Sequence, residues 1–319
     1  MWGWWRRLRS AGEPDPDLAP LTRRGATALR GQLASQLRTR GALVHYEGPT
    51  AVITEARRGV MRVRLADLAR EVAASQHPRA AEFAARQVVD MVFTDPAAGT
   101  MDAAALYRGL RLRVTPTPAD PDSAARPEDA AVLTPFTLDT SVSLVLDTEH
   151  TVQTMPLSRL RELDDMDTLI RAARGNLRTE LRRADVTVAR PHTRPEHEGA
   201  WLWTFESGSV YTASAALIME DVLPVWAPEL DTSEGVLFAM PTRHSLLARP
   251  VTSGTDLLEG LGAIAGAALE IAHQSSEQVS PLLHVSYLGE VTTISGWDPD
   301  TRELTIRPTP HLLLRIQNG

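Results

Sequence analysis

The chain has 319 residues, 43% of them apolar, and a formal net charge of −7. This length is enough for two ordinary domains or one large one, with a sizeable core. The acidic balance argues against a general affinity for nucleic acid, which requires basic side chains to neutralise phosphates. The chain contains no cysteine and no lysine. Disulfides, thiolate ligands, Walker A phosphate loops and Schiff-base chemistry are therefore excluded.

The first ten residues, MWGWWRRLRS, concentrate indole and guanidinium groups before the proline-rich stretch EPDPD. Such groups suit a membrane interface, where indoles lie at headgroup level and arginines contact anionic lipid. The alternative is that the tryptophans pack into a groove of the protein body. The residues expected at a membrane are Trp2, Trp4, Trp5, Arg6 and Arg7. We interpret residues 1–20 as a Trp/Arg appendage followed by a proline hinge.

No apolar run approaches the roughly 18–20 residues of a membrane-spanning helix, and no apolar segment typical of a secretory signal follows the basic start. The sequence therefore predicts a soluble, cytoplasmic protein, with peripheral attachment to the inner face of the membrane as an option.

Residues 21–115 are predicted to form an α+β N-terminal domain. The leucines of 21–40 recur at helical spacing, whereas 59–65 alternates apolar and arginine residues as a half-buried strand does. The expected elements in chain order are a helix at 21–40, strands at 42–46, 51–55 and 59–65, and helices at 65–75 and 79–93.

Residues 116–131 are rich in Pro, Asp and Ala and are predicted to be a linker. An α+β C-terminal domain is predicted over 132–319. Its expected elements are a hairpin of 141–147 with 151–156, helices at 157–162 and 166–183, strands at 185–190 and 201–206, a helix at 212–226, a strand at 235–240, a helix at 256–274 and a closing hairpin around DPDT. The predicted fold class is α+β, with mixed helices and mainly antiparallel sheets in two units.

Several segments resemble the YtpQ-like family of uncharacterised bacterial proteins, which carry a domain of unknown function. The matching segments are SLVLD at 143–147, ARGNLRTEL at 173–181, YTASAALI at 211–218 and VLFAMPTRHSLL at 236–247. In the family an acidic residue usually follows PTR, whereas this chain has His244. The resemblance implies no established activity.

The segment PTRHSLLARP places Arg243 and His244 directly after a predicted buried strand, at the kind of strand end where open α/β sheets often bind ligands. A guanidinium binds carboxylate or phosphate with a planar fork of donors, and an imidazole exchanges protons near neutral pH. The alternative is that Arg243 makes a local salt bridge and His244 is merely exposed. The predicted ligand-binding residues are Arg243, His244, Ser214 and Asn176, although Ser214 also fits a helix cap.

The stretch RPHTRPEHE gathers His192, Glu196 and His197, whose side chains suit zinc or manganese. Two prolines interrupt the spacing, so a solvated loop is the alternative. The segment LEGLGAIAGAALE contains Gly260, Gly262 and Gly266 inside a helical pattern, which favours close packing and a homodimer through the Gly262/Gly266 helix over a dinucleotide fingerprint.

Arg171, Arg174, Arg178 and Arg182 form one stripe along the predicted helix at 166–183. Such a stripe is typical of a solvated face. Together with the arginines of the helix at 21–40, it would also offer a basic surface to an acidic partner or to nucleic acid.

No nucleophile, base and stabiliser occur together at convincing spacing. We therefore expect a non-enzymatic binding or adaptor protein with an unknown protein or small-molecule partner and no cofactor. One alternative is a hydrolase or metal-dependent enzyme that uses Arg243 and His244 or the His192/His197 loop. Nucleic-acid binding through the arginine faces is a further alternative.

Overall fold

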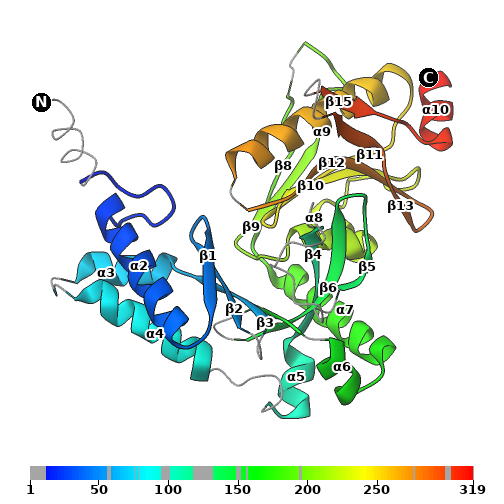
Figure 1. Ribbon diagram of the computed structural model, residues 1–319. Helices are drawn as coiled ribbons and strands as arrows, with labels where there is room; N and C mark the ends of the chain where they lie inside the picture. The colour runs from blue at the N-terminus through cyan, green and yellow to red at the C-terminus, as the bar shows by residue number, and fades with distance from the viewer. Residues whose placement is uncertain are drawn as a thin grey trace, which may run out of the picture. The chain divides into compact units, whose positions relative to one another are not determined.

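The computed structural model describes residues 12–55, 59–75, 77, 79–94, 101–117, 132–148, 152–155, 157–193, 196–275, 277–298 and 303–318. The chain divides into two units, and Figure 1 shows the elements of each. Unit 1 extends to Leu110 and resumes over Val145–Leu169, whereas unit 2 begins at Arg111, includes Val132–Leu144 and continues from Ile170. Both units combine helices with antiparallel sheets, which confirms the predicted α+β class.

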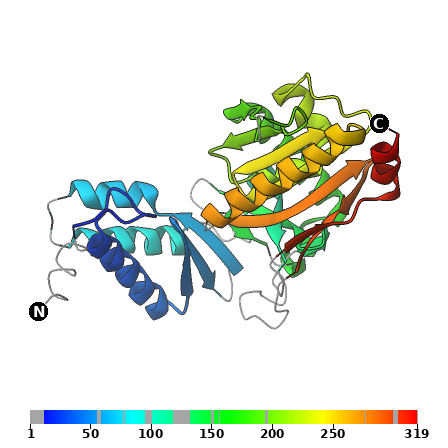
Figure 2. The ribbon, with the colours of Figure 1, turned by 90° about the horizontal axis from the view of Figure 1, so that it is seen from above.

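Unit 1 is built on an antiparallel meander against which helices pack (Figure 2). The leucines of α2 at positions 29, 33 and 37 are fully buried, as the helical spacing predicts. Thr22 caps this helix by accepting a hydrogen bond from the Gly25 amide. The elements are α2 (Arg23–Thr39), β1 (Leu43–Glu47), β2 (Thr50–Glu55), β3 (Gly59–Arg64), α3 (Ala66–Ala74), α4 (Ala80–Thr94), α5 (Ala103–Gly109), β7 (Val152–Thr154) and α6 (Leu157–Leu163).

Residues 13–20, where the sequence predicts a proline hinge, pack onto unit 1. Leu18 is fully buried in the core of unit 1, and the Asp15 carboxylate accepts hydrogen bonds from the guanidinium of Arg30 on α2. The proline-rich segment therefore folds back onto the helix that follows it. The Trp/Arg segment itself, with Trp2, Trp4, Trp5, Arg6 and Arg7, lies outside the described residues.

Unit 2 contains a six-stranded antiparallel sheet in the order β13-β12-β10-β11-β9-β8, with the helix α9 packed on one face (Figures 1 and 2). Leucines 257 and 261 of α9 meet Leu237 and Leu283 of the sheet in the core. The elements are β8 (Val186–Ala189), β9 (Trp203–Ser207), η2 (Ala213–Ile218), α8 (Met219–Trp226), β10 (Val236–Thr242), β11 (Ser245–Pro250), α9 (Gly254–Gln274), β12 (Gln278–Tyr287), β13 (Glu290–Thr293), β14 (Ser295–Asp298), β15 (Glu303–Ile306) and α10 (Pro310–Gln317).

The predicted boundary of 132–319 differs from the observed one. Strand β6 (Thr140–Asp147) pairs through its first residues with β5 (Val132–Pro135) in unit 2, and through its last with β7 in unit 1. Strand β7 in turn pairs with β3 of the N-terminal meander. Pairing between strands far apart in sequence leaves no local signal, so the composition of the chain did not reveal it. The linker expected at 116–131 lies almost entirely outside the described residues.

Strand β12 was not predicted because Pro281 interrupts it. This strand has β10 on one side and β13 on the other, a position where proline is normally excluded for lack of an N–H donor. The register with β10 shifts at this point, since Ala239 pairs with Leu283 but Met240 pairs with Ser280. The irregularity accommodates the proline. Among the described residues, no helix is long and apolar enough to cross a membrane.

Of Gly260, Gly262 and Gly266 on α9, only Gly260 makes the predicted close contact. It faces the fully buried guanidinium of Arg249, which binds the Trp201 carbonyl and the Asp256 carboxylate, each at 2.6 Å. Gly262 and Gly266 are exposed and face open space. The homodimer through these two glycines stays a prediction.

The contact at Gly260 gives a stability test. A Cβ at this position would lie 2.5 Å from Cζ and 2.7 Å from Cδ of Arg249. We expect Gly260→Ala to lower the free energy of unfolding by about 1–3 kcal/mol because the fully buried arginine has no room to shift. Gly262→Ala, on the exposed side of the same helix, should raise it by up to about 1 kcal/mol through helix propensity. Urea denaturation of both variants measures the difference, and equal effects would contradict the packing role of Gly260.

Candidate ligand-binding site

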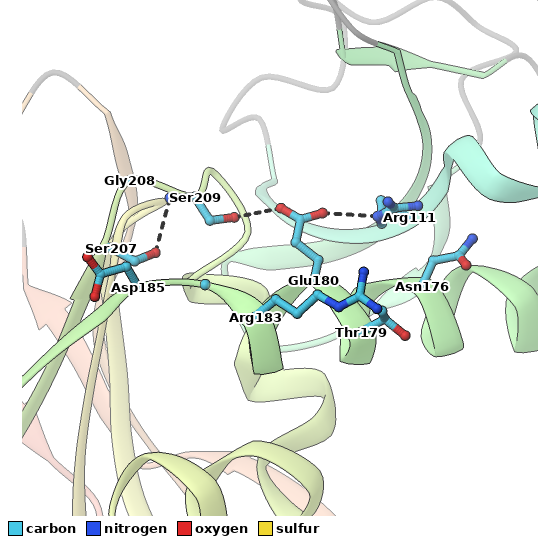
Figure 3. Close-up of a pocket in the computed structure, with 10 residues that line it drawn as sticks. Arg111, Asn176, Thr179, Glu180, Arg183, Asp185, Ser207, Gly208 and Ser209 are labelled. Carbon is cyan, nitrogen blue, oxygen red and sulfur yellow. Dashed lines mark hydrogen bonds and ion pairs between the residues drawn. The ribbon is translucent and has the colours of Figure 1, made fainter.

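A pocket of about 530 Å³ lies in unit 2 where α7 (Met166–Arg183) ends, β8 begins and β9 ends (Figure 3). Most of the residues that line it are polar or charged. Helix α7 contributes its last two turns, and the loop after β9 contributes the opposite wall. The lining residues are Arg111, Asn176, Thr179, Glu180, Arg183, Ala184, Asp185, Ser207, Gly208 and Ser209.

The Glu180 carboxylate is fixed from two sides, as Figure 3 shows. The Nε of Arg111 donates to Oε2 at 3.0 Å, and the Ser209 hydroxyl donates to Oε1 at 2.9 Å. The side chains of Arg111 and Glu180 are only 18% and 27% exposed, so solvent screens this ion pair incompletely. The pocket therefore has a preformed wall of paired charges.

The loop that carries Ser209 is held in turn by His244. Its Nδ1 lies 3.0 Å from the Ser209 carbonyl oxygen, and its Nε2 lies 2.9 Å from Oε2 of Glu277. Both ring nitrogens therefore face oxygen atoms of the protein. His244 thus connects the pocket wall to the Glu277 carboxylate.

Glu277 also binds the guanidinium of Arg243, whose side chain is only 6% exposed. Burial by itself would raise the pKa of Glu277, but hydrogen bonds from His244 and Arg243 lower this pKa to about 2. The carboxylate is therefore ionised at neutral pH and neutralises the guanidinium of Arg243.

The structure brings some of the predicted ligand residues together and separates others. Arg243 and His244 form the two-residue turn of the β10–β11 hairpin, rather than the open strand end that we expected. Asn176 lines the pocket, and His244 lies outside the lining but contacts the carbonyl of the lining residue Ser209. Ser214 is buried away from the lining, where its hydroxyl accepts a hydrogen bond from the Val114 amide at 3.0 Å.

Sequence reasoning missed Arg111, Glu180, Arg183, Asp185 and Ser209. Glu180 and Arg183 belong to the arginine-rich helix whose charges we had interpreted as a solvated face. Arg111 lies 69 positions before Glu180, so nothing local in the sequence indicates their pairing. The clustering of Ser and Gly after β9 was the one available signal for the loop.

The residues predicted to bind a metal do not converge. His197 Nδ1 lies 2.9 Å from Oε1 of Glu259 on α9, and Glu259 also accepts the Gly199 amide. His192 forms an isolated bridge with Trp201. Within the described ranges, no group of three His, Cys, Asp or Glu residues is arranged to hold a metal ion.

Two arginines of the predicted basic stripe are paired with acidic residues of α8. Arg178 lies 2.7 Å from the Asp221 carboxylate, and Arg174 binds Glu220. On α2, Arg30 binds both Asp15 and Asp17. These ion pairs reduce the positive charge available to a nucleic-acid backbone.

A second polar cluster in unit 2, of Asp139, Ser280 and His284, contains the residue types of a hydrolase triad in a different arrangement. The Ser280 hydroxyl donates to Asp139 at 2.8 Å and lies 3.4 Å from His284 Nε2, so serine rather than histidine occupies the centre. Ser280 and His284 are fully buried, and burial lowers the pKa of His284 to about 3. The cluster therefore stabilises β12 rather than presenting a nucleophile.

This chain matches no protein-family model, none of the curated proteins and none of the solved structures with which it was compared. The resemblance to the YtpQ-like family accordingly stays a prediction, and the function must be argued from the site.

The depressed pKa of Glu277 predicts how stability varies with pH. A carboxyl group whose pKa falls on folding stabilises the native state above its unfolded pKa near 4.5, and the contribution disappears as the pH falls toward 2. We expect Glu277→Gln to cost about 2 kcal/mol at pH 7, because it removes the carboxylate that binds the buried guanidinium of Arg243.

Urea denaturation at several pH values measures this cost. The difference between wild type and Glu277→Gln should shrink steadily below pH 5. Glu290→Gln, at an exposed position on β13, serves as the matched control and should have little effect at any pH. A pH-independent cost for Glu277→Gln would contradict the assignment of a charged Glu277.

Proposed function

We propose that this protein is a non-enzymatic binding protein whose unit 2 pocket holds a polar ligand that carries both a carboxylate and N–H donors. The observation that carries the proposal is the pairing of opposite charges in the lining, with Glu180 fixed by Arg111 and with Arg183 and Asp185 at exposed positions. Among the described residues, neither Arg183 nor Asp185 makes an ion pair.

The formal charge of the pocket lining indicates which class of ligand the pocket would bind. Two arginines, Arg111 and Arg183, stand against two acids, Glu180 and Asp185, so the formal charge of the lining is zero. A phosphate dianion gains little from such a site. A guanidinium binds a carboxylate through two parallel hydrogen bonds, and carboxylate oxygens accept N–H groups. An amino-acid-like or peptide-like group satisfies both halves of the lining.

The enzymatic alternatives have less support from the geometry. Arg243 is buried and bound to Glu277, so it does not face a substrate. Both nitrogens of His244 contact oxygen atoms of the protein, which leaves neither for proton transfer to a ligand in this arrangement. In the binding proposal, Arg243 and His244 do not contact the ligand. Together with Glu277 they hold the loop that carries Ser209.

The proposal is tested by binding measurements with N-acetylated amino acids and free-acid dipeptides as probes. We expect chemical-shift changes at the pocket and an affinity that falls ten- to hundredfold in Arg183→Ala, since a hydrogen-bonded charge pair contributes about 1.5–3 kcal/mol. Arg182→Ala is the matched control, because this neighbouring arginine of α7 is exposed and outside the lining.

Inorganic phosphate serves as the second probe and should bind more weakly than the carboxylates. Failure of every carboxylate probe to bind the wild type would refute the proposal, as would equal affinities for the Arg183→Ala and Arg182→Ala variants.

A further inference from the structure

We infer that the ligand is the C-terminal segment of a partner protein, which adds as an antiparallel strand to the free edge of β8 and places its terminal carboxylate in the pocket. This inference rests on the proposed function and names the partner class. Three features of unit 2 support it: the open edge of β8, the position of the pocket at the start of that strand, and the distribution of charge along it.

Strand β8 is an edge of the six-stranded sheet. It pairs antiparallel with β9, from Val186 opposite Ser207 to Ala189 opposite Thr204, and no other strand of the described chain pairs with it. Its side chains are exposed except for the half-buried Val186. An edge strand presents unpaired N–H and C=O groups that a second extended chain can bind.

The pocket lies at the first residue of this edge. Ala184 and Asp185 line the pocket and immediately precede Val186, while Ser207, the partner of Val186, lines its other side. A strand added antiparallel to β8 ends beside the beginning of β8. Its terminal carboxylate therefore arrives at the pocket, where Arg183 lies (Figure 3).

The position of the pocket favours this direction over the parallel one. A C-terminal segment added parallel to β8 would carry its terminal carboxylate to the far end of β8, away from Arg183 and Arg111. At that far end Arg190 lies 3.8 Å from the ring centre of Trp201 and also over Trp203. This exposed guanidinium suits an acidic side chain upstream in the peptide. The four residues of β8 span about 13 Å, which sets the length of the paired segment.

A second copy of this chain is a less suitable occupant of the edge. In a symmetric antiparallel pair of β8 strands, residues that face each other must point to the same face of the sheet. One residue therefore lies opposite its own copy across the two-fold axis. With the axis on Thr187, Arg190 faces Ala184, and with the axis on Val188, Arg190 faces Val186. In neither register does Asp185 lie opposite an arginine. The terminal carboxylate of an added peptide, by contrast, lies beside Arg183.

The test uses full-length protein and fluorescein-labelled heptapeptides, Glu-Val-Thr-Val-Thr-Val followed by each amino acid in turn with a free carboxylate. We expect the best peptide to bind at least tenfold more tightly than the N-acetylated form of its last residue. Its C-terminal amide should bind at least tenfold more weakly. Arg183→Ala should weaken binding by a similar factor, and Arg182→Ala should leave it unchanged.

Two N-methylated versions of the best peptide test strand addition itself. The methyl groups occupy alternate residues, and the two sets are shifted by one position. Because only alternate N–H groups of an added strand face its neighbour, one set should abolish binding and the other should change affinity less than threefold. Hydrogen exchange of the β8 amides should slow when the unmodified peptide binds.

The outcomes separate this inference from the proposed function. If N-acetylated amino acids bind but no peptide gains affinity, the strand model is overturned and the binding pocket remains. If no carboxylate probe binds, both are overturned. Equal effects of the two N-methyl sets exclude strand addition. A protein dimer in sedimentation experiments, protected at β8 and unaffected by peptide, assigns the edge to a second copy.

Discussion

The carboxylate of Glu277 is the constraint on which the site depends. It binds the side chains of Arg243 and His244, which form the turn of the β10–β11 hairpin, and the hydrogen bonds from both of them lower its pKa. His244 then fixes the Ser209 carbonyl, and the Ser209 hydroxyl fixes Glu180. The position of Glu180 in the pocket wall is therefore fixed through three successive contacts that begin at Glu277. Because these side chains are already ordered, a ligand that binds the pocket would lose little free energy in ordering them.

Unit 2 buries a second guanidinium by the same means. Arg249 is fully buried, yet it is surrounded by the carbonyls of Gly199 and Trp201 and by the Asp256 carboxylate. Burial lowers the pKa of Arg249, while its hydrogen bond to Asp256 acts in the opposite direction. The chain has no lysine, and arginines are the buried cations of its described residues. The planar fork of donors on a guanidinium allows several acceptors to compensate for the loss of water.

The parts of the fold that local patterns specify were predicted from the sequence. Helix α2 follows from its leucine spacing and Thr22 cap, and the β1–β2–β3 meander from its turns and alternation. The membership of β6 and β7 in the two units, and the strand β12, were not predicted, because they depend on nonlocal pairing and on an irregularity around Pro281. At the site, the prediction that Asn176 and His244 bind a ligand stays a prediction, although Asn176 lines the pocket and His244 contacts its wall. Arg111 and Glu180 meet only in the folded chain.

Pro281 also sets the alignment of the sheet. A strand that slips by one residue turns every side chain to the opposite face, so the register is strongly specified wherever one face of the strand is buried. In β12 a slip would move the residue without an N–H into a position that needs one, and it would turn Leu283 and Val285 away from the core they share with α9. Pro281 therefore favours one register between β12 and β10.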